Sequence, residues 1–203
     1  MRTVARLSED DMVAAFLKAE VASPRYGSRL RLELVRLGLR PELLERPDTT
    51  DQLANGDRRA VLDAHRGYLS GTRLFDGFPD DVEWWLCCAT PEDLAKVRYI
   101  DYDFWNDHSD GTRRPAVAAE RLRANGKAAP APEAVEGIVE GLRQGRVPPP
   151  LIVVGRSPSD PLVVLEGHTR LTAYAFAPEA LPPELEVIAG WSKRMGEWDL
   201  YGY

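Results

Sequence analysis

Five consecutive residues between an apolar segment and a helical pattern form a motif suited to binding an anion. They are Glu166, Gly167, His168, Thr169 and Arg170. Gly167 permits a tight turn, and Thr169 is the expected N-cap of the helix that follows. The amides of that helix start, the imidazole of His168 and the guanidinium of Arg170 would converge on a phosphate or carboxylate. The alternative is a plain strand, turn and helix in which Arg170 pairs with a surface carboxylate.

A second stretch, residues 100–114, is dense in acids and also holds an amide, an imidazole and two guanidinium groups. A strand is expected over 99–103. If Asp101 and Asp103 point the same way off its end, their carboxylates meet at one point. That arrangement suits Mg²⁺ or a hydroxyl awaiting deprotonation.

Two arginines close this stretch. Arg113 and Arg114 follow a turn at Asp110 and precede a predicted helix over 116–122, so either would reach the phosphates bound by Arg170. The alternative is an ordinary acidic loop with an Asx turn and a charged helix start.

The cysteines and histidines argue against other chemistry. Cys87 and Cys88 are adjacent and are expected to pack as small hydrophobic residues in a buried strand, which fits a reducing, cytoplasmic location. His65, His108 and His168 are dispersed, so no zinc-ligand spacing occurs. His65 is expected to be a hydrogen-bonded packing residue.

The composition indicates a protein that buries a sizeable core. The chain has 203 residues, 44% of them hydrophobic, and a formal charge of -6, so nucleic-acid binding by the whole surface is disfavoured. No apolar run of about 18 residues and no signal-peptide pattern is present, so neither membrane insertion nor export is expected.

Residues 1–82 are predicted to form a helical region. Ser8 and Asp11 form a capping box at the start of the first helix, the second helix begins at Ser28, and the third covers 57–69.

Residues 83–203 are predicted to form a mixed-sheet domain with flanking helices, which makes the chain an α+β protein. A short Ala/Pro connector begins at residue 127, and the aromatic residues near the chain end are expected to fold back on the core. Strands are predicted around Trp84 and over 99–103, 151–154, 162–165 and 185–188, with helices over 91–97, 116–122 and 133–143 and after Thr169.

The order of these elements resembles the ParB/sulfiredoxin superfamily over residues 99–192. The resemblance is carried by the segment 146–154 (Arg-Val-Pro-Pro-Pro-Leu-Ile-Val-Val), the hairpin after it, and the glycine-to-arginine motif 167–170 at a helix start. In that superfamily the motif holds nucleotide phosphates. The resemblance therefore implies a nucleotide-binding domain.

Departures from the family pattern narrow the expected activity. Sulfiredoxins carry their catalytic cysteine where this chain has His168, so sulfinic-acid reduction is not expected. Chromosome-partition members carry a second arginine where this chain has Thr169, and a helix-turn-helix domain follows their motif, whereas this chain stops at Tyr203. A DNA-segregation clamp is therefore not expected either. The run from Gly167 to Arg170 is more similar to the motif of free-serine kinases.

The resemblance thus implies a small-molecule kinase or an ATPase that uses ATP or another nucleotide with Mg²⁺. In this scheme Arg170 and Arg113 clamp phosphate oxygens, with Arg114 nearby. His168 donates a hydrogen bond beside Gly167 and Thr169. Glu166 or Asp103 is the base, and Asp101 holds the metal. The alternatives are a nuclease-like member of the same fold and a non-catalytic adaptor.

Overall fold

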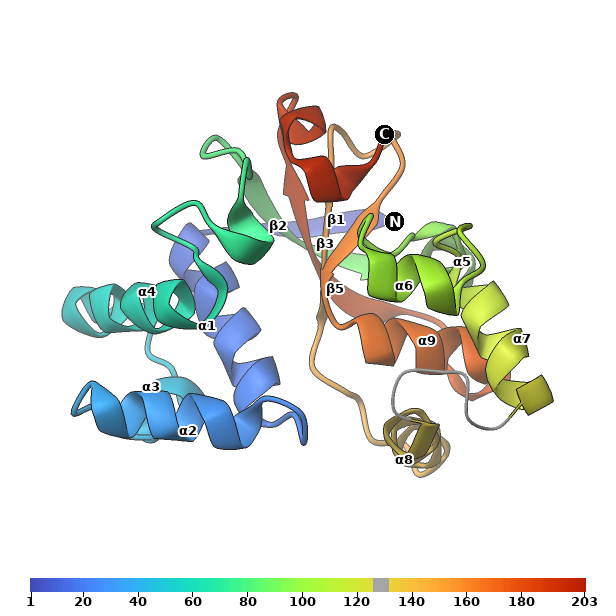
Figure 1. The fold of residues 1–203 in the computed structure, drawn as a ribbon, viewed down its shortest axis with the longest axis horizontal. Coiled ribbons are helices and arrows are strands. Elements are labelled where there is room, and N and C mark those ends of the chain that lie inside the picture. The colour runs from blue at the N-terminus through green and yellow to red at the C-terminus, as the bar shows by residue number, and fades with distance from the viewer. Residues whose placement is uncertain (126–131) are drawn as a thin grey trace. The chain divides into compact units, whose positions relative to one another are not determined.

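The computed structural model describes residues 1–125 and 132–203, and the chain divides into two compact units. Residues 7–80 form a helical unit, and residues 1–6 with 81–203 form an α+β unit (Figure 1). The connector expected from residue 127 begins outside the described residues. The α+β prediction is confirmed: a helical region precedes a domain with a mixed sheet and flanking helices.

The helical unit begins with the predicted capping box. The Ser8 hydroxyl accepts from the Asp11 amide at 3.1 Å, and the Asp11 carboxylate accepts from the Ser8 amide at 2.9 Å. The third long helix begins earlier than predicted because Asp51 caps it, accepting from the amides of Leu53 and Ala54. The helices of this unit are α1 (Glu9–Val21), α2 (Gly27–Arg36), α3 (Glu42–Glu45) and α4 (Gln52–Arg66), followed by the 3-10 turn η1 (Arg73–Phe75).

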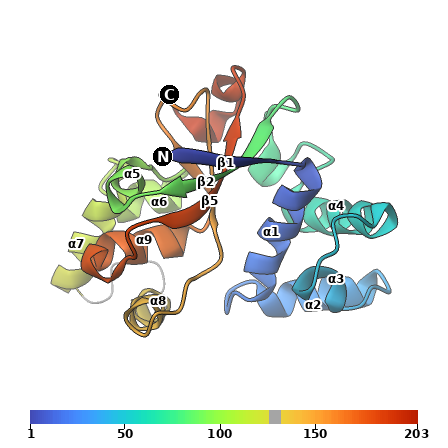
Figure 2. The ribbon, with the colours of Figure 1, turned by 180° about the vertical axis from the view of Figure 1, so that it is seen from behind.

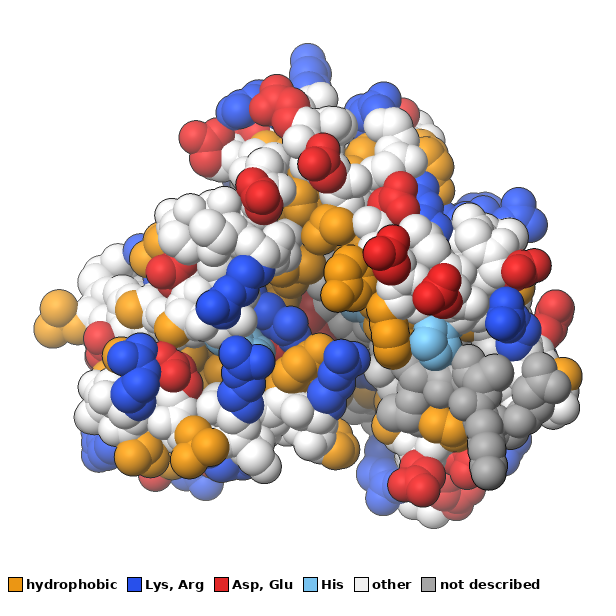
Figure 3. Space-filling model, viewed as in Figure 1, with side chains coloured by type: hydrophobic (Ala, Val, Ile, Leu, Met, Phe, Trp, Pro, Cys, Tyr) orange, Lys and Arg blue, Asp and Glu red, His pale blue; other side chains and the backbone are white. Residues whose placement is uncertain are grey.

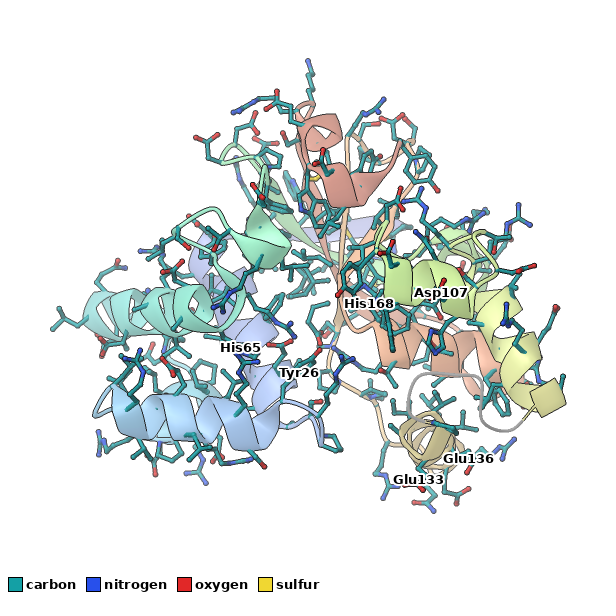
Figure 4. The ribbon with its side chains drawn as sticks, viewed as in Figure 1. Tyr26, His65, Asp107, Glu133, Glu136 and His168 are labelled. Carbon is teal, nitrogen blue, oxygen red and sulfur yellow. The ribbon has the colours of Figure 1, made fainter. Side chains whose placement is uncertain are left out.

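A buried charged cluster joins α1 to α4. The Glu20 carboxylate is ion-paired with Arg66, and its Oε2 lies 2.6 Å from Nε2 of His65. Tyr26 packs edge-on against His65, with ring centroids 5.6 Å apart, and lies under the Arg66 guanidinium. The predicted packing role of His65 is confirmed, since its side chain is buried in this cluster (Figure 4).

We expect Glu20→Gln to lower the free energy of unfolding by about 1–3 kcal/mol at neutral pH. Burial by itself raises the pKa of Glu20, but the hydrogen bond from His65 and the charge of Arg66 outweigh it and lower the pKa below its ordinary value of 4.5. A lowered folded-state pKa stabilises the fold above pH 4.5, and this contribution disappears as the pH falls through the folded value. Urea unfolding between about pH 3 and pH 7 measures the effect.

The difference between wild type and Glu20→Gln should shrink in acid. The matched control is Glu45→Gln, because Glu45 is exposed and its carboxylate lies 3.5 Å from Arg31. This control should change stability by less than about 0.5 kcal/mol at every pH. Equal effects of the two substitutions would contradict the assignment.

The α+β unit is built on a five-stranded sheet in the order β1-β2-β5-β3-β4 (Figures 1 and 2). The hairpin β3–β4 is antiparallel, β3 lies parallel to β5, and β5 lies antiparallel to β2. The strands are β1 (Arg2–Leu7), β2 (Glu83–Ala89), β3 (Leu151–Gly155), β4 (Val163–Glu166) and β5 (Leu185–Trp191).

Helices α7, α8 and α9 lie together beside this sheet and share an apolar cluster that includes Leu122, Val135, Val139 and Ala173 (Figure 2). No described helix has the length and apolar character needed to span a membrane. The helices of the unit are α5 (Pro91–Lys96), α6 (Asp103–His108), α7 (Pro115–Asn125), α8 (Pro132–Arg143) and α9 (His168–Phe176), with 3-10 turns η2 (Pro178–Ala180), η3 (Met195–Glu197) and η4 (Asp199–Tyr201).

Two local predictions for this unit differ from the structure. The strand expected over 99–103 is wrong: only an isolated bridge joins Arg98 to Val163, and Asp103 opens α6 instead. The first residues of the chain, where no strand is predicted, form the edge strand β1. The prediction for the aromatic chain end is confirmed for Trp198 and Tyr201, which are fully buried.

Candidate functional site

The junction between β4 and α9 has a backbone conformation that favours glycine. Gly167 has φ of +104°, and a Cβ there would lie 2.4 Å from Cδ2 of Leu151. Gly167, not Thr169, is the N-cap, so the predicted cap is wrong and Thr169 becomes the second residue of α9. No side chain caps this helix. Because first-turn amides have no intrahelical acceptor, this helix start can bind an anion.

The Arg170 guanidinium is directed into the protein. Arg170 is 8% exposed and donates to the Pro150 carbonyl at 2.9 Å, and also to the Pro149 carbonyl and the Glu166 carboxylate. The structure therefore brings Glu166 and Arg170 together as a largely buried pair that ties the segment before β3 to α9. Tyr174 packs close by, where burial raises its pKa to about 12.

The imidazole of His168 lies under an indole ring. The Trp105 ring centroid is 4.7 Å from that of His168 and 4.6 Å from that of Tyr99, and both pairs are stacked. The centroids of Tyr99 and His168 are 6.1 Å apart, so the three rings form a triangle in which Trp105 covers both neighbours. Stacking of this kind restricts the ring orientation of His168 at the helix start.

Hydrogen bonds also hold the first turn of α9 in place. The Tyr99 hydroxyl lies 2.7 Å from the Thr172 hydroxyl, which donates to the His168 carbonyl at 2.9 Å. Burial raises the pKa of Tyr99 above its ordinary value of 10, which further favours the neutral phenol. The first turn of α9 is therefore held by packing and by hydrogen bonds.

Helix α6, which carries Trp105, also carries two exposed carboxylates. Asp103 and Asp107 are both exposed and stand one helical turn apart, on one side of α6. Trp105 is buried, and the His108 ring contacts the Phe104 ring in a tilted arrangement, with centroids 4.4 Å apart. Figure 4 shows Asp107 on α6 and His168 at the start of α9.

Arg113 and Asp101 both contact the C-terminal residues of the chain. Arg113 donates to the carbonyls of Tyr201 and Gly202, each at 2.9 Å, and its guanidinium lies 4.5 Å from the Tyr203 ring centroid. The Asp101 carboxylate accepts from Asn106 at 2.8 Å. Arg113 and Arg170 thus have separate partners.

The expected meeting of Asp101 and Asp103 does not occur on a strand end, because Asp103 belongs to α6. Arg114 is exposed beside Arg113. Within residues 1–125 and 132–203, no group of three or more His, Cys, Asp or Glu side chains is placed to hold a metal ion. A metal here would need most of its ligands from a bound phosphate and water.

Four residues of this region, Tyr99, Trp105, Asp107 and Thr172, are not among those predicted from the sequence. A signal for two of them was present, because Trp105 and Asp107 lie in the dense stretch that stands out for its acids. Tyr99 and Thr172 carried no such signal. Comparison of the chain with protein-family models, with curated proteins and with solved structures finds no match in any of the three.

Proposed function

We propose that this protein binds a nucleotide through its phosphates at the start of α9 and transfers or hydrolyses the terminal phosphoryl group. One observation carries the proposal: α9 begins at a left-handed glycine with no side-chain cap, beside an imidazole that Trp105 holds in place. Phosphates bind readily at such helix starts, where backbone N–H groups and the positive end of the helix dipole coincide.

Each nearby side chain then has a defined role. The first-turn amides of α9 and the His168 imidazole donate to phosphate oxygens. Arg170 acts as a positioning residue, because its guanidinium holds two backbone carbonyls and Glu166. Since Glu166 accepts from Arg170, Asp103 is the better candidate to take a proton from the attacking hydroxyl or water. Phosphoryl transfer depends mainly on such positioning and on neutralising charge.

ATP with Mg²⁺ remains the proposed cofactor pair. When bound, Mg²⁺ neutralises phosphate charge. It usually takes one or two protein carboxylates together with phosphate oxygens and water, which fits a site with no three-ligand cluster in the described ranges. Asp101 is the proposed carboxylate. The formal charge of -6 favours a small molecule over a nucleic acid as the phosphoryl acceptor.

We expect ATP or ADP with Mg²⁺ to raise the Tm of the full chain and His168→Ala to weaken nucleotide affinity roughly tenfold, because one hydrogen bond to a charged oxygen is lost. Isothermal titration calorimetry measures the affinity. His108→Ala is the matched control: His108 is a second imidazole, whose Nδ1 lies 2.6 Å from the Phe104 carbonyl. This variant should bind nucleotide nearly as tightly as wild type.

Asp103→Asn separates binding from turnover. If Asp103 takes the proton, this variant should keep its nucleotide affinity and lose roughly 10²–10⁴-fold in phosphate release or transfer. Absence of binding by every nucleoside triphosphate tested, with or without Mg²⁺, would refute the function. Equal losses of affinity in His168→Ala and His108→Ala would refute the assignment of the site.

A further inference from the structure

The arginines of this acidic protein are concentrated around α2. Residues 25–46 contain six arginines and three glutamates, whereas the whole chain has a formal charge of -6. Figure 3 shows Lys and Arg side chains gathered over α2. The arginines are Arg25, Arg29, Arg31, Arg36, Arg40 and Arg46.

One exposed row on α2 has an apolar residue between two of these charges. Arg29, Leu32 and Arg36 follow the i, i+3, i+7 spacing of a single helix face. Leu32 is 70% exposed, and Val35 beside it is 77% exposed. Leu30 and Leu34 already anchor the opposite face in the core. We call the row Arg29, Leu32 and Arg36 the basic row.

Helix α8 carries a row of the opposite charge whose spacing, i, i+4, i+7, is that of the basic row in reverse order. Glu133, Gly137 and Glu140 are exposed, while Val135 and Val139 face the core. Figure 4 shows Glu133 on the outer side of α8. A Cβ at Gly137 would meet no atom within 4 Å, so the helix backbone is uncovered between the two carboxylates, and we call this uncovered position the notch. We call Glu133, Gly137 and Glu140 the acidic row.

We propose that the basic row of one copy of this chain docks on the acidic row of a second copy. Each row spans seven residues, or about 10 Å along its helix axis, so both end charges pair when Leu32 enters the notch at Gly137. This register requires antiparallel helices, in which Arg29 faces Glu140 and Arg36 faces Glu133; in a parallel pair Leu32 would lie one residue short of Gly137. In a two-fold dimer the contact occurs twice, because each copy supplies both rows.

Two of the four end charges have no ion pair in the described residues, and the other two have partners on their own helices that docking would have to replace. In the described parts of the chain no ion pair involves Arg29 or Glu133, while Arg36 pairs with Glu33 and Glu140 accepts from Gln144 on their own helices. Exposed leucine between the charges favours a protein helix over a nucleic-acid backbone, which offers it no apolar contact. Because the area is small, the dimer should be weak and salt-sensitive.

Charge reversal tests the proposal in the full chain. Sedimentation velocity over about 1–500 µM should show a monomer–dimer equilibrium at low salt. Arg29→Glu with Arg36→Glu should abolish it, and so should Glu133→Arg with Glu140→Arg. The two variants mixed together should form a heterodimer, because every contact is then complementary. One chain that carries all four substitutions should dimerise again.

Two further variants separate the contact from folding. Gly137→Leu should raise helix stability yet weaken association at least tenfold, because it fills the notch. Leu32→Asp should also weaken association, whereas Leu53→Asp, at a position on α4 that is 84% exposed, should not. A chain that stays monomeric, a dimer insensitive to the reversals, or a mixture that does not associate would each overturn the proposal.

Discussion

Gly167→Ala is expected to lower the free energy of unfolding by about 2–4 kcal/mol, because it combines backbone strain with overpacking. An L-residue at φ of +104° is strained, and the added Cβ would lie 2.4 Å from Cδ2 of Leu151 in the adjacent strand β3. Relief requires the hairpin or the start of α9 to shift. The shift would move the first-turn amides, so nucleotide affinity should fall as well. Urea unfolding followed by circular dichroism measures the stability.

Gly145→Ala isolates the backbone contribution to this loss. Gly145 also has a positive φ, +75°, and belongs to the same unit, but a Cβ there would meet nothing within 4 Å. We expect it to cost about 1 kcal/mol, the strain alone, and to leave nucleotide binding unchanged. If Gly167→Ala and Gly145→Ala lower the free energy of unfolding equally, the close contact with Leu151 is not the reason that this junction needs a glycine.

Local sequence signals predicted the strand-to-helix junction well. A run of β-prone residues, a glycine and a helical pattern are neighbours along the chain, so their interactions are visible in the sequence. The capping box at Ser8 is equally local, since its two residues are three positions apart. Thr169 was the expected cap on the same local grounds, because threonine is a common capping residue with a side-chain oxygen. The left-handed conformation of Gly167 moved the helix start upstream instead.

Non-local contacts decided the features that the sequence could not predict. Strand β1 is exposed along almost its whole length, so it has no alternating apolar pattern and exists because it pairs at the edge of the sheet. The stacking of Trp105 on His168 joins residues far apart in the chain. From the sequence, Arg113 could either bind an anion or be an ordinary charged residue at a helix start. In the structure its partners are the carbonyls of Tyr201 and Gly202, which lie almost 90 residues further along the chain.

Arg170→Met is expected to destabilise the protein by roughly 3–5 kcal/mol, the usual cost of removing one partner from a buried ion pair. The Arg170 and Glu166 side chains are 10% and 13% exposed, so the Glu166 carboxylate would have little access to water to replace the lost guanidinium. The carbonyls of Pro149 and Pro150 would lose the same donor. Methionine preserves most of the apolar contact, so the loss reports the guanidinium rather than a cavity.

A double-mutant cycle then distinguishes a positioning role from direct phosphate binding. Adding Glu166→Gln to Arg170→Met should recover part of the stability, because the negative charge that Arg170 balances is then removed as well. Arg170→Lys keeps the positive charge, but an ammonium lacks the planar guanidinium geometry that donates to the Pro149, Pro150 and Glu166 oxygens. This substitution should therefore also destabilise the protein. If Arg170 acts by positioning, nucleotide affinity will follow stability across these variants. An Arg170→Lys protein of wild-type stability that has lost only its affinity for ATP would instead identify the guanidinium as a direct phosphate ligand.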